Sequence, residues 1–328
     1  MRIAKAQRIG RSVSSIGLGC WQLGGDWGDT DEQRSQDILH AAADAGTTFF
    51  DTADVYGDGR SEKSIGQFLK DRDDSDGFFV ATKMGRRLPE QVAEGYTLDN
   101  YRRWTDRSRE NLDVDTLDLV QLHCPPSEVL RDPQTYDDLR VLKDEGRIRD
   151  FGISVEICDD ALHAIGEDDL ASVQIIFNVF RRKPAERFLR AATDRGVAVI
   201  SRVPLASGLL SGKYDATTTF AANDHRNYNR DGSAFDVGET FAGVPFEIGV
   251  KAAQDVAELT PSGWTTAQMA LRWVEQMGST TVIPGARTPE QARLNAAVGE
   301  LPTIPEETMA ALAKIYNDQI REHVHTRW

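Results

Sequence analysis

The stretch FFDTADVYGDG, which runs from Phe49 to Gly59, passes from two aromatic residues of the buried type directly into the acid Asp51. Tyr56 follows five residues later, and two glycines come soon after it. A strand that serves only the core has little reason to end in a carboxylate followed by a phenol. We therefore ask whether other apolar runs of the chain end in polar side chains in the same way.

Apolar runs rich in β-branched residues alternate with amphipathic helical segments along the chain. The runs are SSIGLG (14–19), TTFFDT (47–52), GFFVATK (77–83), LDLVQLH (117–123), IRDFGIS (148–154), ASVQIIFN (171–178), VAVISRVPL (197–205) and TTVIPG (280–285). This alternation predicts parallel strands joined by helical crossovers. Eight such units fit a (β/α)₈ barrel better than a doubly wound sheet, and no run is followed by the G-x-G-x-x-G of a Rossmann fold.

We therefore expect an α/β fold, a single TIM barrel domain that spans residues 1–328. Helical segments at 289–298 and 305–321 follow the last strand and would be additions at the C-terminal end of the barrel. The stretch 206–245, rich in Asn, Asp, Gly and Thr, is too long for an ordinary crossover and predicts a long loop over the barrel mouth.

Charge and composition argue against several classes of binding partner. The net charge of −14 argues against a nucleic acid or an anionic membrane as partner, and no apolar run has membrane-spanning length. The N-terminal segment lacks the apolar core of a secretory signal, and three cysteines show neither a pairing pattern nor metal-ligand spacing. We expect a cytoplasmic protein with no bound metal and a small-molecule partner.

The surplus of acids comes with few lysines, since only 9 of the 38 basic residues are Lys. Such a surface is typical of a high-salt cytoplasm, where screening reduces the repulsion between like charges. Our hypothesis is that the source is a halophile. A melting temperature that stays constant across a salt series would contradict it.

Three neighbouring strands and one loop place chemically active side chains at the same end of the predicted barrel. The second run ends in Asp51, the third in Lys83 and the fourth in His123, while Tyr56 lies in the loop after the second. Active sites of such barrels form at the C-terminal ends of the strands. A lysine ammonium beside a phenol favours proton release, a carboxylate keeps that lysine charged, and an imidazole can orient a carbonyl oxygen. The set predicts proton transfer to or from a substrate oxygen.

The segments that carry these residues resemble the signature segments of the aldo-keto reductases. They are DTADVYG, ATK and QLHCP, together with GLGCWQLGGDWG, FGIS, PLASGLLSGKY and VIPGARTPEQARLNAAV in the same order along the chain. The resemblance implies that Asp51, Tyr56, Lys83 and His123 form a catalytic tetrad. It further implies hydride transfer between NADPH and an aldehyde or ketone, or the reverse oxidation.

The resemblance also implies a set of cofactor contacts. They are Cys20, Trp21, Ser154, Gln174 and Arg202 at the nicotinamide end, Pro204, Leu205, Ser207, Gly208, Leu209 and Lys213 over the pyrophosphate, and Gly285, Ala286, Arg287, Gln291 and Asn295 at the adenosine end. Arg287 would pair with a 2′-phosphate, which favours NADPH over NADH. Trp27, in the loop after the first strand, is a candidate for the substrate pocket.

Two residues depart from the pattern that many members of this family share. Val155 stands where an Asn is common, and Arg202 stands where an aromatic commonly stacks on the nicotinamide. A guanidinium can lie flat on a ring or reach toward phosphates. Two other functions stay open from the sequence: a cofactor-binding regulatory or sensor protein with little turnover, and a barrel aldolase or isomerase with Lys83 as a Schiff-base nucleophile.

Overall fold

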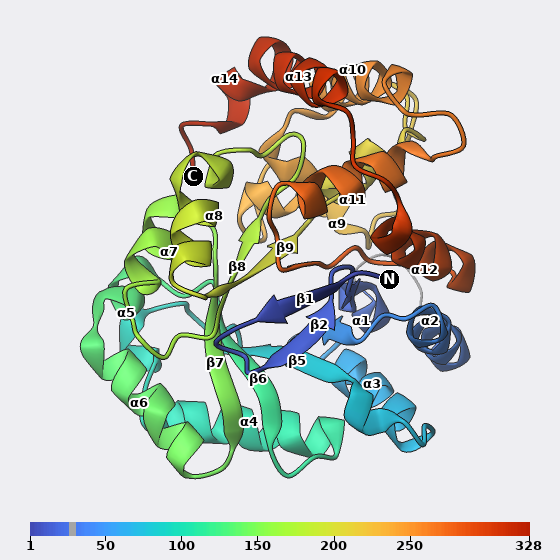
Figure 1. Cartoon of the computed structure of the whole chain (residues 1–328). Helices are drawn as coiled ribbons and strands as arrows, with labels where there is room; N and C mark the ends of the chain where they lie inside the picture. The colour runs from blue at the N-terminus through green and yellow to red at the C-terminus, as the bar shows by residue number, and fades with distance from the viewer. Residues whose placement is uncertain (26–30) are drawn as a thin grey trace.

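The computed structural model describes residues 1–25 and 31–328. A sheet of eight parallel strands forms a barrel at its centre. Figure 1 shows the strands in the middle of the molecule. The strands are hydrogen-bonded in chain order: β3 (Leu18–Gly19), β4 (Phe49–Asp51), β5 (Phe79–Met84), β6 (Leu117–His123), β7 (Ile148–Val155), β8 (Ser172–Ile176), β9 (Ala198–Arg202) and β10 (Thr281–Val282). Parallel bridges from Ile16 to Val282 and from Gly19 to Gly285 close the barrel between its first and last strands. The predicted (β/α)₈ architecture is confirmed.

Helices surround this barrel as an outer ring, as Figure 1 shows. The helices of the described residues, including the short α1 and α9 at the barrel mouth, are α1 (Trp21–Gly24), α2 (Glu32–Asp44), α3 (Arg60–Lys70), α4 (Leu98–Leu112), α5 (Ser127–Arg131), α6 (Pro133–Asp144), α7 (Cys158–Ala164), α8 (Pro184–Asp194), α9 (His225–Tyr228), α10 (Phe246–Glu258), α11 (Thr266–Gln276), α12 (Pro289–Ala296), α13 (Glu306–Ile315) and α14 (Arg321–Val324). Several begin at residues suited to a helix start. Thr265 and Gln268 form a capping box at α11, and Asp132 caps α6 ahead of Pro133. None of the described helices is both long and apolar enough to cross a membrane.

The C-terminal helices differ from the sequence prediction of one helix over 305–321. The helix is interrupted after α13 by a π-helical turn, Tyr316–Ile320, and resumes as α14. Tyr316 and Ile320 are buried in this turn. The chain then ends at Trp328, which is also buried.

An antiparallel hairpin, β1 (Ile3–Ala6) with β2 (Arg11–Ser14), precedes the barrel. Its apolar residues Ile9 and Val13 belong to the same buried cluster as Phe49 and Phe79 from the barrel strands. The hairpin therefore contributes to the packing inside the barrel. Sequence reasoning missed it because its strands have only four residues each and each includes a basic residue, Lys5 in β1 and Arg11 in β2.

The segment 206–245 lies over the barrel mouth, as predicted. It contains α9 and three short 3-10 turns, Ala206–Ser211, Val237–Glu239 and Phe241–Gly243. Residues of this segment line cavities together with residues from the strand ends. We call 206–245 the mouth loop.

One close approach positions the loop that carries Tyr56. Gly57 has φ +59°, and a Cβ there would lie 2.2 Å from the carbonyl oxygen of Gly24 at the end of α1. Only glycine fits both the backbone angle and the contact. The contact brings α1 against the loop, so that the Trp21 ring stacks near the Tyr56 ring, with centroids 6.0 Å apart.

Candidate active site

The ends of β4 and β5 place a buried lysine between a carboxylate and a phenol. Lys83 Nζ lies 2.5 Å from Asp51 Oδ2 and 3.4 Å from the Tyr56 hydroxyl, and it donates to the Thr52 carbonyl at 2.8 Å. The lysine side chain is only 1% exposed, so its charge has no solvent to stabilise it. The charge of Lys83 is therefore stabilised by Asp51. The ammonium group points toward three oxygen atoms, and the third of them is the phenol oxygen.

Two side-chain amides, from β6 and β8, lie close to the other oxygen of Asp51. Gln174 Nε2 on β8 donates to Asp51 Oδ1 at 2.7 Å, and Gln121 Nε2 on β6 lies 3.4 Å from the same oxygen. Gln174 thus supports the carboxylate that supports Lys83. The sequence did not single out Gln121, although it lies two residues before His123 and so shares that strand's inward face.

Burial and charge set the protonation states of these groups. Burial raises the pKa of Tyr56 to about 12, with Lys83 opposing the rise and Asp51 adding to it. Burial alone would lower the pKa of Lys83, but Asp51 and Tyr56 together raise it above its ordinary value. The pKa of His123 is well below 6.5 because of burial and the nearby Arg86, Lys83 and Arg202. At neutral pH the site holds a protonated phenol, an ammonium and a neutral imidazole.

A cavity of about 370 Å³ runs from Tyr56 to the end of the barrel near α12. Of the predicted cofactor contacts it is lined by Trp21, Gln174, Arg202, Pro204, Leu205, Ser207, Gly208, Lys213, Gly285, Arg287, Gln291 and Asn295. Four predicted contacts do not line the cavity and are buried in the protein: Cys20, Ser154, Leu209 and Ala286. The lining that sequence reasoning missed includes Gln22, Tyr214, Arg226 and Gln268.

This cavity suits a long anionic ligand. Lys213, Arg226 and Arg287 line it, and α12 begins beside it at Thr288. Gly208 has φ +98°, a backbone angle that favours glycine, where the mouth loop borders the cavity. The residues present therefore fit a dinucleotide.

A second cavity, of about 610 Å³, opens on the other side of Tyr56. Its lining includes His123 and Arg86 from the strand ends, and Phe235 and Glu239 from the mouth loop. Among the described residues, Trp21, Tyr56 and Glu239 line both cavities. A ligand in the first cavity and a ligand in the second would therefore meet beside these three residues. The predicted pocket residue Trp27 lies outside the described residues.

Comparison with known proteins agrees with this arrangement. A family model described as the Aldo/keto reductase family matches residues 15–317. The chain belongs to the aldo/keto reductase family. Aldo-keto reductase YhdN of Bacillus subtilis is 31% identical over 293 residues, which cover 86% of this chain and 84% of the relative. The resemblance inferred from the motifs is thus confirmed, and the protein is an NAD(P)H-dependent oxidoreductase.

Two further similarities extend over most of the chain. Aldo-keto reductase yakc [NADP(+)] of Schizosaccharomyces pombe is 26% identical over 289 residues, covering 86% of this chain and 82% of the relative. The structure of the glycerol dehydrogenase AKR11B4 from Gluconobacter oxydans superimposes with a TM-score of 0.78 at 26% identity, covering 99% of this chain and 97% of the other.

In this aldo/keto reductase, Arg202 at the end of β9 is held by two carboxylates. Its Nη2 lies 2.9 Å from Glu156 Oε2, and its Nη1 lies 2.5 Å from Glu239 Oε2. It also donates to the Val155 carbonyl at 3.1 Å. The guanidinium is therefore occupied by these partners at the end of β9. Sequence reasoning did not identify either glutamate.

The backbone after Arg202 is strained. Val203 has φ 51°, in the left-handed region that a β-branched residue rarely adopts. The buried Asn178 side chain donates to the Val203 carbonyl at 2.9 Å and stabilises this conformation. Such strain is typical of functional sites, and here it fixes the direction in which the chain leaves β9 toward the mouth loop.

Proposed function

We propose that this protein reduces aldehydes or ketones to alcohols with NADPH, or catalyses the reverse oxidation, with Tyr56 as the general acid and base. The observation that carries the proposal is the position of the Tyr56 hydroxyl, 3.4 Å from the buried Lys83 ammonium and at the junction of two cavities. The first cavity, whose lining includes Gln174, Ser207 and Arg287, would hold the cofactor, and its nicotinamide would supply the hydride to the carbonyl carbon. Tyr56 gives its proton to the carbonyl oxygen, and the neutral His123 orients that oxygen.

NADPH is the proposed cofactor because the cavity ends in cationic side chains. Arg287 is exposed at its rim, and Lys213 and Arg226 line it. A guanidinium suits a 2′-phosphate, which NADH lacks. The name of the Schizosaccharomyces pombe relative includes NADP(+), which supports the same cofactor. We expect micromolar binding of NADPH and markedly weaker binding of NADH in a fluorescence titration.

The protonation states support this chemistry over the aldolase alternative. A Schiff-base lysine must be a neutral amine to attack a carbonyl, but the pKa of Lys83 is raised by Asp51 and Tyr56. Lys83 is also enclosed, with its Nζ directed at three oxygen atoms. All the groups that the proposed proton transfer needs are present, which likewise supports an enzyme and not a purely regulatory protein.

Replacing Tyr56 by Phe tests the mechanism directly. The substitution removes the proton donor and keeps the ring that stacks on Trp21, so we expect kcat to fall by about 10²–10⁴-fold. The affinity for NADPH, measured by fluorescence titration, should stay within about threefold because the phenol oxygen is directed at Lys83. Activity within tenfold of the wild type would exclude Tyr56 as the proton donor.

A further inference from the structure

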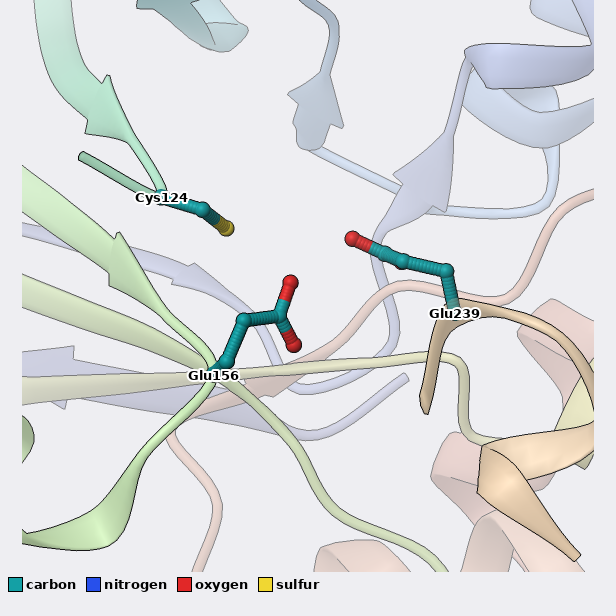
Figure 2. Close-up of side chains that lie close together, drawn as sticks. All are labelled: Cys124, Glu156 and Glu239. Carbon is teal, nitrogen blue, oxygen red and sulfur yellow. The ribbon is translucent and has the colours of Figure 1, made fainter. Parts of the chain in front are cut away.

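Glu239 extends from the mouth loop into a cluster of side chains at the ends of β6 and β7. Figure 2 shows its carboxylate pointing toward Cys124 and Glu156, and one potential ligand atom of each of the three lies within 4.8 Å of the others. The Arg202 guanidinium contacts both carboxylates, at 2.5 Å from Glu239 and 2.9 Å from Glu156. It already supplies positive charge to the cluster, which therefore does not need a metal ion. The geometry of the cluster depends instead on how the mouth loop holds Glu239.

Glu239 belongs to a pair of 3-10 turns in the mouth loop, Val237–Glu239 and Phe241–Gly243, which we call the paired turns. The Ser207 hydroxyl joins them, because it donates to the Glu239 carbonyl at 3.1 Å and accepts from the Phe241 backbone N–H at 3.0 Å. Ser207 lines the first cavity, and Glu239 lines both cavities. The position of the paired turns therefore affects the two cavities together.

Trp328, which is only 5% exposed, packs against the paired turns. Its indole Nε1 donates to Asp236 Oδ1 at 3.1 Å, and the same carboxylate accepts from the Gly238 N–H at 2.6 Å in the first turn. Gly243 has φ +79°, and a Cβ there would lie 2.3 Å from the Trp328 ring. The ring therefore lies directly against the backbone of the second turn.

Arg181 holds the Trp328 ring from the barrel side. Its guanidinium carbon lies 3.5 Å from a ring centroid of Trp328, which is a cation–π contact. Arg181 is 3% exposed, and its guanidinium donates to the Glu156 carbonyl at 3.2 Å. Its backbone N–H donates to the Asn178 carbonyl at 3.0 Å, close to the end of β8. Trp328 therefore connects the barrel wall to the paired turns.

The segment that precedes Trp328 is attached to the outer helices. His325 Nε2 lies 3.0 Å from Glu186 Oε1 on α8, and its Nδ1 lies 2.8 Å from the Tyr316 hydroxyl. Tyr316 is itself buried in the π-helical turn that follows α13. Trp328 thus reaches the mouth loop from a segment that has its own attachments outside this loop.

We propose that Trp328 is a positioning residue for the reaction, because it holds the paired turns beside both cavities through its bond to Asp236. With the turns in place, Glu239 meets Arg202, and Ser207 stays in the wall of the first cavity. The effect on turnover rests on the proposed function, whereas the effect on the mouth loop does not depend on it.

Limited trypsin digestion measures the position of the mouth loop without any assay of activity. The loop contains two exposed sites for trypsin, Lys213 and Arg230. Trp328→Leu removes both the aromatic ring and the indole N–H. We therefore expect cleavage at these two sites to be about tenfold faster than in the wild type, because the loop opens more often. Cleavage of Trp328→Leu at the wild-type rate would overturn the proposal.

The matched control is Tyr136→Leu on α6. Tyr136 is a buried aromatic residue whose hydroxyl donates to the Leu130 carbonyl at 2.9 Å, so this substitution also removes a ring and one donor. The control loses stability in the outer ring of helices, and its cleavage at Lys213 and Arg230 should stay within about twofold of the wild type. Equal acceleration in both variants would show that overall stability sets the cleavage rate, and it would overturn the role of Trp328.

Steady-state kinetics with NADPH and 4-nitrobenzaldehyde separate positioning from stability. In Trp328→Leu we expect both KM values to rise about tenfold while kcat stays within about threefold, since binding and not chemistry is impaired. The chemical step should persist because Lys83 is held by Asp51 on β4. A variant that is only less stable contains less active protein, which lowers kcat and leaves KM unchanged. That pattern would overturn the proposal.

Trp328→Phe tests the connection through Asp236. It keeps an aromatic ring beside Arg181 and removes the N–H donor, so both KM values should rise less than in Trp328→Leu. In an Asp236→Ala background the same substitution should change KM by less than about twofold, because the acceptor is already absent. A rise as large as in the wild-type background would show that Trp328 does not act through Asp236, and it would overturn this part of the proposal.

An NADPH titration of the same preparations separates this inference from the proposed function. Absence of both NADPH binding and turnover in the wild type would remove the proposed function, while the trypsin rates would still decide whether Trp328 holds the mouth loop. Normal turnover together with equal trypsin rates in the wild type and Trp328→Leu would remove only the role of Trp328.

Discussion

Lys83 and Arg202 are both cations that lie near the ends of barrel strands, and both are almost completely buried. They differ in where their counter-charges come from. Lys83 is paired with Asp51 from the neighbouring strand, whose other oxygen is held by Gln174 from a third strand. Arg202 takes one carboxylate from Glu156, directly after β7, and the other from Glu239 in the mouth loop.

Because of this difference, the two cations have different roles in the protein. All partners of Lys83 belong to the barrel wall or to the loop fixed by the Gly24–Gly57 contact, so its geometry is set by the fold itself. Arg202 connects the barrel wall to the mouth loop, because Glu239 belongs to that loop. We therefore expect that removing Lys83 mainly slows the chemical step. Removing Arg202 should mainly affect the mouth loop and lower the stability of the fold.

Replacing Lys83 by Met is expected to give the largest effect. Without the ammonium, Tyr56 loses the charge that lowers its pKa, and Asp51 becomes a buried carboxylate with only amide partners. We expect the rate of hydride transfer in single turnovers to fall by about 10²–10⁴-fold. The matched control is Lys143→Met, which removes a lysine paired with Asp150 at 3.2 Å on the outer side of the barrel. A rate within tenfold of the wild type would show that Lys83 does not act on Tyr56.

Replacing Arg202 by Met tests the other half of the comparison. It leaves Glu156 and Glu239 close together without their principal cation, and breaking a buried ion pair typically costs about 3–5 kcal/mol of stability. Urea unfolding should show this loss. Adding Glu239→Gln to Arg202→Met should recover part of it, because one uncompensated charge is removed.

The control for this experiment is Arg190→Met, since the Arg190 side chain is 91% exposed. A substitution at such a site usually changes stability by less than about 0.5 kcal/mol. If Arg202→Met were no less stable than this control, Arg202 would not be the group that balances the two glutamates.

The pH dependence of the two reaction directions sharpens the role of Lys83. Reduction needs the protonated Tyr56 phenol, which is present throughout the range below a pKa of about 12. The reduction rate should therefore be flat between about pH 6 and 9. Oxidation needs the phenolate, whose fraction rises tenfold per pH unit below the pKa, so its rate should rise steadily over the same range. A bell-shaped reduction profile centred near pH 6.5 would instead indicate a titrating imidazole.

The strand-end residues were predictable from the sequence because their positions follow from periodicity. Asp51, Lys83 and His123 each end an apolar run, and parallel strands of a barrel bring such ends to one rim. Glu239 was not predictable, since it lies in a polar loop without periodic pattern, and only the folded loop shows that it meets Arg202. The hairpin β1–β2 was missed for a related reason, because its burial depends on contacts with Phe49 and Phe79 from the barrel.

A fourth buried carboxylate completes the comparison, since the Asp54 side chain has no hydrogen-bond partner within the described part of the chain. Asp54 lies two residues before Tyr56, and neither of its side-chain oxygens has a hydrogen-bond partner among the described residues. Burial raises its pKa to about 7, with Glu62 adding to the rise and Arg87 and Arg107 opposing it. Whereas Asp51 and Glu156 are paired with cations, Asp54 is protonated in the folded protein at mildly acidic pH.

Replacing Asp54 by Asn is expected to give the smallest effect and to depend on pH. In the unfolded chain Asp54 ionises near pH 4, so between pH 4 and 7 the folded state binds more protons than the unfolded state. The stabilisation that protonated Asp54 gives to the folded state is therefore fully present below about pH 4, and it is lost as pH rises through 7. The Asn variant removes the ionisation, so it should be more stable than the wild type at pH 8 by on the order of 2 kcal/mol. Melting temperatures at pH 5 and pH 8 measure this, with the exposed Asp73→Asn as control. Were Asp54→Asn and Asp73→Asn to show the same change between the two pH values, Asp54 would be ionised in the folded protein despite its burial.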